Sequence, residues 1–286
     1  MTIKMIASDI DGTLINNEHK VTDYTREIVQ KVRQQGVEFV IATGRNYDSA
    51  VEVAAQLGIP NGEMGIVSLN GLRVENPLTG YSEHGRTMTF EECRKFEVIG
   101  RKYHMGVLYC LEDIIYYHMD DLSFQDYELG VDEDRMTFFN DRATTLKING
   151  LDDIKHIFDE GQEILKMVYI QNGDYTELVK ERVAAEFDED FVLLVVGFGW
   201  AEIMHRDVNK GDALVKYAAT RGIKPEEILS FGDSDNDLTL IERCGCGVAM
   251  ANARENLKAI ADDIADSNDD NGVANYIVKN ILKEVA

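Results

Sequence analysis

The chain is poor in cysteine and proline, and each shortage excludes a class of protein. Its 286 residues include four cysteines and three prolines, too few for a disulfide-rich secreted scaffold or a proline-rich linker protein. Cys93 and Cys110 are isolated, and Cys244 and Cys246 lack the spacing and the second ligand pair of a zinc site. We therefore expect reduced, structural thiols.

Basic residues are scarce as well. Lys and Arg total 29 against 52 Asp and Glu, which gives a formal net charge of −23. This charge repels nucleic acids and anionic membranes, so neither is an expected partner. It also repels phosphate esters, and a site for them would need local positive charge from a metal ion and a lysine.

No long hydrophobic run is present. The longest strongly apolar stretch, Phe191 to Ala201, is shorter than the roughly 18 residues that suggest a membrane span, and we expect it to form a buried strand or hairpin. The first residues lack the apolar core of a secretory signal, so we expect a cytoplasmic protein.

Strand and helix patterns alternate at both ends of the chain, as is typical of an α/β protein. The first part predicts strands at 3–8, 37–42 and 65–69 and helices at 21–36 and 47–57. The alternation resumes with a helix at 211–221 and a strand at 228–231, and continues to a terminal helix at 273–284. We expect one Rossmann-like, doubly wound parallel sheet built from both ends.

The middle of the chain shows a different pattern. Strands at 106–110, 114–117, 167–171 and 191–196 and helices at 90–103 and 175–186 predict an α+β insert. We therefore expect a core of residues 1–80 and 200–286 and an inserted cap domain of residues 81–199. Such an insert can act as a lid that selects the substrate.

Two carboxylates follow the first predicted strand. Asp9 and Asp11 lie where the strand ends and Gly12 begins a turn, and ligands bind at this edge of an open parallel sheet. Carboxylates this close repel each other unless a cation such as Mg²⁺ bridges them. Asp9 is suited to attack phosphorus and form an aspartyl-phosphate, and Asp11 to act as general acid and base. The alternative is an exposed turn.

Two further segments supply groups for a phosphoryl oxygen. Thr43 and Gly44 end a strand before a helix, where a hydroxyl and backbone N–H groups can bind an anion, although Thr43 as a helix N-cap explains the pattern equally well. Lys210 adjoins the predicted N-cap Asn209, where a cation opposes the helix dipole unless an anion is near. A surface lysine is the alternative.

A second acidic segment, Gly232 to Asp237, follows another buried strand. Asp233 can complete a metal site while Asp237 supports the ligands from behind; a solvated acidic loop is the alternative. A calcium loop of EF-hand type is excluded, because Leu238 and Cys244 occupy the positions of its glycine and glutamate. The six histidines lack metal-ligand spacing, and we expect structural or surface roles for them.

Together these segments resemble those of the haloacid dehalogenase superfamily, specifically the Cof-like hydrolases with a type IIB cap between the second and third motifs. The four motifs are Asp9-Ile10-Asp11-Gly12-Thr13-Leu14, Ala42-Thr43-Gly44-Arg45, Val208-Asn209-Lys210-Gly211 and Gly232-Asp233-Ser234-Asp235-Asn236-Asp237.

The resemblance implies a role for each motif residue. It implies Asp9 as nucleophile and Asp11 as general acid and base. It implies that Thr43, Lys210 and Asn236 contact the phosphoryl group. It further implies Mg²⁺ held by Asp9, the Asp11 carbonyl and Asp233. An aspartate at position 11 resembles the pattern of the phosphatases and phosphomutases of the superfamily, because its dehalogenases and phosphonatases lack this acid.

The sequence thus favours a Mg²⁺-dependent phosphatase that hydrolyses small phosphorylated metabolites, such as sugar phosphates or similar phosphomonoesters. Two alternatives stay open: a sugar phosphomutase, and a metal-binding regulatory module without turnover. The sequence specifies neither a particular substrate nor an oligomeric state.

Overall fold

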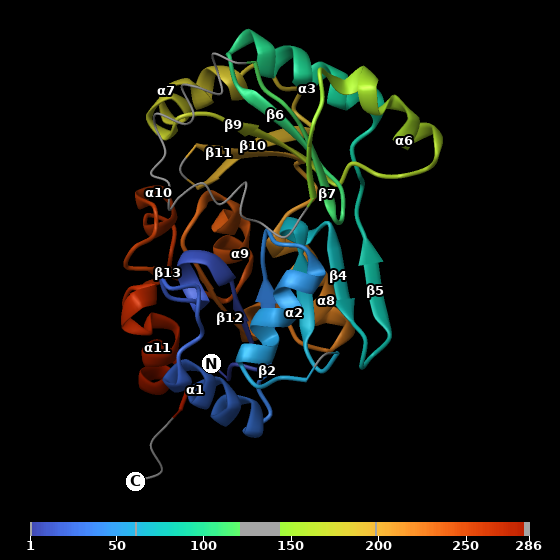
Figure 1. Cartoon of the computed structure of the whole chain (residues 1–286). Coiled ribbons are helices and arrows are strands. Elements are labelled where there is room, and N and C mark those ends of the chain that lie inside the picture. Colours follow the sequence, from blue (N-terminus) through green and yellow to red (C-terminus); the bar gives the residue numbers. More distant parts are fainter. Residues whose placement is uncertain (1, 61, 121–143, 198, 283–286) are drawn as a thin grey trace. The chain divides into compact units, whose positions relative to one another are not determined.

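A computed structural model describes residues 2–60, 62–120, 144–197 and 199–282. The chain divides into two compact units (Figure 1). The first combines Met1–Gly85 with Val208–Ala286, and the second is Arg86–Asp207. Within the described ranges, no helix is both long enough and apolar enough to cross a membrane.

The first unit, which we call the core, contains an eight-stranded sheet in the order β14-β13-β12-β1-β2-β3-β4-β5. Its strands are β1 (Met5–Ser8), β2 (Glu38–Ala42), β3 (Gly65–Ser68), β4 (Arg73–Asn76), β5 (Tyr81–His84), β12 (Ile228–Gly232), β13 (Cys246–Met250) and β14 (Asp263–Ala265). Neighbours from β14 to β3 are parallel, and β4 and β5 add an antiparallel edge. The order reverses at β1, between β2 and β12, which creates the crevice where ligands bind in such sheets.

Helices cover both faces of this sheet (Figure 1). One apolar cluster joins the sheet to α1 (Asp23–Gln34), α2 (Tyr47–Gln56), α10 (Glu255–Lys258) and α11 (Gly272–Asn280). A second joins it to α8 (Lys210–Thr220) and α9 (Leu238–Arg243). In β1, Ile6 belongs to the first cluster and its neighbours Met5 and Ala7 to the second, because successive strand side chains point to opposite faces. The predicted doubly wound α/β core is confirmed.

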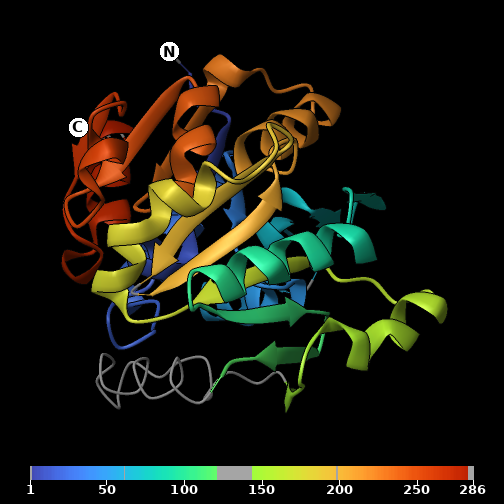
Figure 2. The same ribbon diagram turned by 90° about the horizontal axis from the view of Figure 1, so that it is seen from above.

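The second unit, which we call the insert, contains a six-stranded sheet in the order β10-β11-β9-β6-β7-β8. Its strands are β6 (Gly106–Cys110), β7 (Ile114–His118), β8 (Thr144–Lys147), β9 (Lys166–Ile170), β10 (Phe191–Gly197) and β11 (Trp200–His205). Its helices are α3 (Phe90–Lys102), α6 (Lys155–Asp159) and α7 (Gly173–Ala184). Side chains of α3 and α7 share one apolar cluster with the sheet, and Figure 2 shows both helices, green and yellow, in front of the strands. The predicted α+β character of the insert is confirmed.

The observed unit borders differ from the predicted ones. The insert spans Arg86–Asp207 rather than 81–199. β5 pairs with β4 and so extends the core sheet, whereas β11 pairs with β10 and β9 inside the insert. A sequence pattern does not show which sheet a segment near such a border joins, because that depends on pairing with distant strands. The β10–β11 pair is the hairpin expected for the apolar stretch near residue 191.

Candidate active site

The loops that follow β1 and β12 touch each other. Asp9 directly follows β1, and its backbone N–H donates to the carbonyl of Phe231 at 3.1 Å. Gly12 has φ +69°, and a Cβ there would lie 2.6 Å from Oδ2 of Asp233. Only glycine combines this backbone conformation with so close an approach. The hydroxyl of Thr13 donates to Oδ1 of Asp233 at 3.0 Å, so the first and last motifs are in direct contact.

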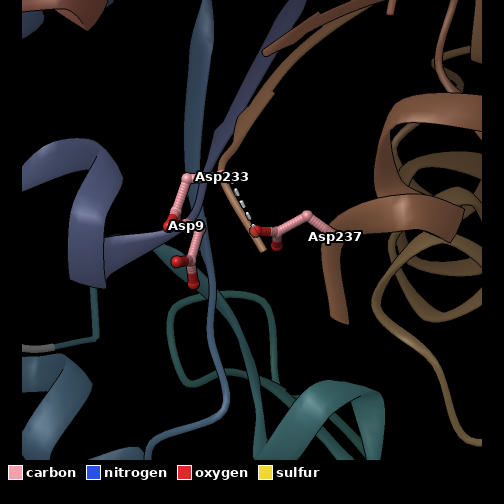
Figure 3. Close-up of side chains that lie close together, drawn as sticks. All are labelled: Asp9, Asp233 and Asp237. Atoms are coloured by element: carbon pink, nitrogen blue, oxygen red, sulfur yellow. Dashed lines mark hydrogen bonds between the residues drawn. The ribbon is translucent and has the colours of Figure 1, made fainter. Parts of the chain in front are cut away.

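Three carboxylates gather at this point. Asp9, Asp233 and Asp237 each place a carboxylate oxygen within 4.8 Å of the others, and Figure 3 shows Asp237 pointing toward the strand ends that carry the other two. Burial and the Asp237 charge raise the pKa of Asp233 to about 7. Burial also raises the pKa of Asp9, against the opposing influence of Lys210. Such an acidic cluster, rich in oxygen ligands, fits a divalent cation.

Asp237 holds its neighbours in place with both oxygens. Oδ1 accepts from Nζ of Lys210 at 2.7 Å. Oδ2 accepts from the backbone N–H groups of Asp233 and Ser234 at 3.0 and 3.1 Å, and the first of these bonds is the dashed line in Figure 3. The side chain is fully buried. Asp237 therefore braces the loop that carries Asp233.

Lys210 is a buried cation at the centre of the site. Its side chain is 0% exposed, and Nζ donates to Asp9 Oδ1 and Asp237 Oδ1, each at 2.7 Å. Burial lowers the pKa of Lys210, but the charges of Asp237 and Asp9 outweigh that effect and raise it. Lys210 is therefore charged and bonded to the predicted nucleophile. As predicted, Asn209 caps α8, and its Oδ1 accepts from the Asp212 N–H at 2.8 Å.

Thr43 and Gly44 follow β2, and Gly44 lies beside Asn236. The Thr43 side chain is buried, and its hydroxyl accepts from the Arg45 N–H at 3.1 Å. The alternative that Thr43 caps the next helix is wrong, because Asn46 caps α2. A Cβ on Gly44 would lie 3.5 Å from Nδ2 of Asn236, so the second and fourth motifs meet here.

Asp11 is not one of the three clustered carboxylates, and it is held by Arg45, for which the sequence predicted no role. Arg45 donates through Nε to Asp11 Oδ2 at 2.7 Å and through Nη2 to Oδ1 at 2.5 Å. The Asp11 carboxylate is half-exposed. Such a two-point contact fixes the carboxylate orientation. The signal available was a basic residue next to Thr43 and Gly44 in a strongly acidic chain.

Comparison with known proteins agrees with this geometry. A family model described as haloacid dehalogenase-like hydrolase matches residues 6–277. Phosphatase YwpJ of Bacillus subtilis is 29% identical, over 98% of this chain and 100% of its own length. The 5-amino-6-(5-phospho-D-ribitylamino)uracil phosphatase YwtE of B. subtilis is also 29% identical, over 96% of this chain and 97% of its own. The solved structure of a haloacid dehalogenase-like hydrolase from B. subtilis is 27% identical with a TM-score of 0.80, and the match covers 98% of this chain and 100% of that one.

Proposed function

Because the chain belongs to the haloacid dehalogenase-like hydrolases and is a phosphoric monoester hydrolase of that family, we propose a specific activity for it. It is a Mg²⁺-dependent phosphatase of small phosphorylated metabolites, sugar phosphates or similar phosphomonoesters. It works through an aspartyl-phosphate on Asp9. The observation that carries the proposal is the bond between Lys210 and Asp9 inside the buried carboxylate cluster.

Asp9 is the nucleophile. The bond from Lys210 fixes one of its oxygens, and the lysine charge favours the ionised form that attacks phosphorus. A bond forms between an Asp9 oxygen and phosphorus while the ester P–O bond breaks. Lys210, the Thr43 hydroxyl and the Asn236 amide stabilise the charge that develops on the phosphoryl oxygens.

Asp9 and Asp233 are the side chains that would hold Mg²⁺, with the Asp11 carbonyl as the further ligand that the family resemblance implies. Their oxygens are the ligands that this ion prefers. Burial and the charge of Asp237 raise the pKa of Asp233, and a bound cation would offset both effects. The ion, when bound, offsets charge on the phosphoryl oxygens. Asp237, already engaged with Lys210 and the backbone, braces the site.

Asp11 is the general acid and base. In its protonated form it gives a proton to the leaving alcohol in the first step. In the second step it takes a proton from a water molecule whose oxygen attacks phosphorus, while the bond between Asp9 and phosphorus breaks and inorganic phosphate leaves. Arg45 orients its carboxylate through the two bonds described above.

The insert selects the substrate, and its sequence contains no pattern that identifies a particular phosphomonoester. The relative YwtE is named for a phosphorylated ribityl compound, so this compound belongs in any substrate panel beside sugar phosphates. No disulfide joins the four cysteines, all of which lie in the described ranges, and this supports the reducing cytoplasm as the location we propose.

The test is release of inorganic phosphate from a panel of sugar phosphates, nucleotides, the ribityl compound and an aryl phosphate. Asp9→Asn keeps the shape of the side chain and removes the charge of the nucleophile. We expect wild-type turnover in Mg²⁺, none with chelator, and none in Asp9→Asn. The control Asp23→Asn makes the same change at a carboxylate that is 91% exposed and should keep full activity.

Each contrary outcome identifies a different error. Full activity in Asp9→Asn would overturn the aspartyl-phosphate mechanism, and full activity in chelator would overturn the metal requirement. Conversion of a sugar phosphate to its isomer, dependent on a sugar bisphosphate, would indicate the phosphomutase. Silence of the wild type across the panel would refute the phosphatase proposal.

A further inference from the structure

The turn Leu69–Gly71, which follows β3, has an unusual backbone. Leu69 and Asn70 both have left-handed conformations, with φ 50° and 56°, and Gly71 has φ 96°. Non-glycine residues rarely adopt this region; asparagine is among the more tolerant, whereas a bulky residue such as leucine is an outlier there. Leu69 is 5% exposed and Asn70 1%. Such a buried, strained backbone persists only where surrounding contacts determine it, and strain of this kind concentrates at functional sites.

The turn contacts three of the four motifs. The backbone N–H groups of Leu69 and Asn70 donate to the carbonyls of Arg45 and Thr43, each at 2.9 Å. A Cβ on Gly71 would lie 2.4 Å from the carbonyl oxygen of Asn209, the residue before Lys210. The turn is therefore fixed against the second and third motifs.

The fourth motif is reached by a side chain. Oδ1 of Asn70 accepts from Nδ2 of Asn236 at 2.9 Å. A carboxamide nitrogen carries two hydrogens, so this bond uses one and leaves the other for a phosphoryl oxygen. Oδ1 of Asn236 is buried and has no hydrogen-bond partner in the described part of the chain. The bond to Asn70 is therefore what determines which end of the Asn236 carboxamide faces the neighbouring Gly44.

We propose that Asn70 is a positioning residue of the phosphate site, acting through Asn236. This inference rests on the proposed phosphatase function. With Asn70 in place, the Asn236 carboxamide presents an N–H to the phosphoryl group. Without it, the carboxamide is free to turn and present its oxygen, which repels the anion.

A matched control exists in the same unit. Asn271 has nearly the same backbone, φ 58° and ψ 40° against 56° and 30° for Asn70. Its Oδ1 accepts from the hydroxyls of Thr22 and Thr25, at 2.5 and 3.3 Å, which belong to the start of α1 and not to the four motifs. Glycine at either position keeps the left-handed backbone and deletes one accepting side chain.

The experiment compares Asn70→Gly with Asn271→Gly. We expect Asn70→Gly to lower kcat/KM and to raise the inhibition constant of inorganic phosphate, each by about 10- to 100-fold. Asn271→Gly should leave both values within about twofold, because Asn271 contacts none of the four motifs and substitutions at residues without shared contacts usually act independently. Asn70→Asp, which keeps an acceptor oxygen and tolerates the left-handed backbone, should give intermediate values.

A double-mutant cycle separates positioning from general damage. If Asn70 acts through Asn236, Asn70→Gly costs little further activity in an Asn236→Ala background. Additive losses, or wild-type behaviour of Asn70→Gly, would overturn the proposal. Calorimetric titration of inorganic phosphate into each Mg²⁺-loaded variant needs no turnover. A wild type that hydrolyses no substrate therefore refutes the proposed function. The difference in phosphate affinity between Asn70→Gly and Asn271→Gly still decides whether Asn70 positions the phosphate site.

Discussion

At the scale of the residue, one buried cation in the site offsets the charge of two buried carboxylates. Lys210 is fully buried and bonds two carboxylates, those of Asp9 and Asp237. Removing one partner of a buried ion pair leaves an uncompensated charge, which costs far more than the pair itself contributes. The two carboxylates therefore compensate the charge of Lys210, which is buried at the start of α8 although the helix dipole disfavours a cation there.

Arg45 permits a prediction at this scale. Arg45→Ala should lower kcat/KM by about 10-fold or more, because the Asp11 carboxylate loses the two-point contact that orients it. Arg45→Lys should recover only part of the loss, since an ammonium group cannot reproduce the fork of a guanidinium. Steady-state kinetics of both variants check this.

The control is the same change in an Asp11→Asn background. If Arg45 acts by orienting Asp11, Arg45→Ala should have little further effect there. Equal losses in both backgrounds would instead mean that Arg45 contributes by another route.

The sequence predicted the strand ends that carry the candidate site residues, but not the contacts between their side chains. Asp9, Thr43 and Asp233 follow recognisable strands of one parallel sheet, and the ends of parallel strands meet at one edge. The bonds of Arg45 to Asp11 and of Asn70 to Asn236 join residues 34 and 166 positions apart. They depend on how loops pack in space, which a local pattern does not encode.

At the scale of the element, α8 shows which part of a helix is predictable. The N-cap Asn209 and the resumed alternation of helix and strand patterns predicted a helix at 211–221, and the helix runs from Lys210 to Thr220. By contrast, the short strands β4, β5, β8 and β14 were not predicted. They have three or four residues each, too few for a clear alternation, and several are edge strands that pair on one side only.

The packing of α8 gives a second prediction. Leu214 is 0% exposed, in the apolar cluster between α8 and the sheet. Leu214→Ala should lower the free energy of unfolding by about 2–5 kcal/mol, because it removes buried methyl groups and leaves a cavity. Urea denaturation followed by circular dichroism measures this.

Leu178 in α7 is the matched control, because the same side chain is 77% exposed there. Leu178→Ala should change the free energy of unfolding by no more than about 0.5 kcal/mol. Similar losses in both variants would mean that packing against the sheet does not stabilise α8 as described.

At the scale of the whole molecule, the net charge of −23 opposes the function we propose. A phosphomonoester carries negative charge and must approach an acidic protein before Lys210 and a bound cation can act on it. The repulsion extends over roughly 30 Å at 0.01 M salt but only about 8 Å at 0.15 M. Distant charges therefore matter in dilute buffer and lose most of their influence at physiological ionic strength.

The corresponding prediction concerns salt. Raising KCl from about 0.01 to 0.15 M, with free Mg²⁺ saturating, should raise kcat/KM for a sugar phosphate by roughly threefold to tenfold, because screening weakens the long-range repulsion. The value of kcat should stay constant, since the bound substrate contacts the same groups. Sucrose at matched osmolality should have no such effect. A fall in kcat/KM over this range would show that local positive charge, rather than the net charge of the chain, governs the approach of substrate.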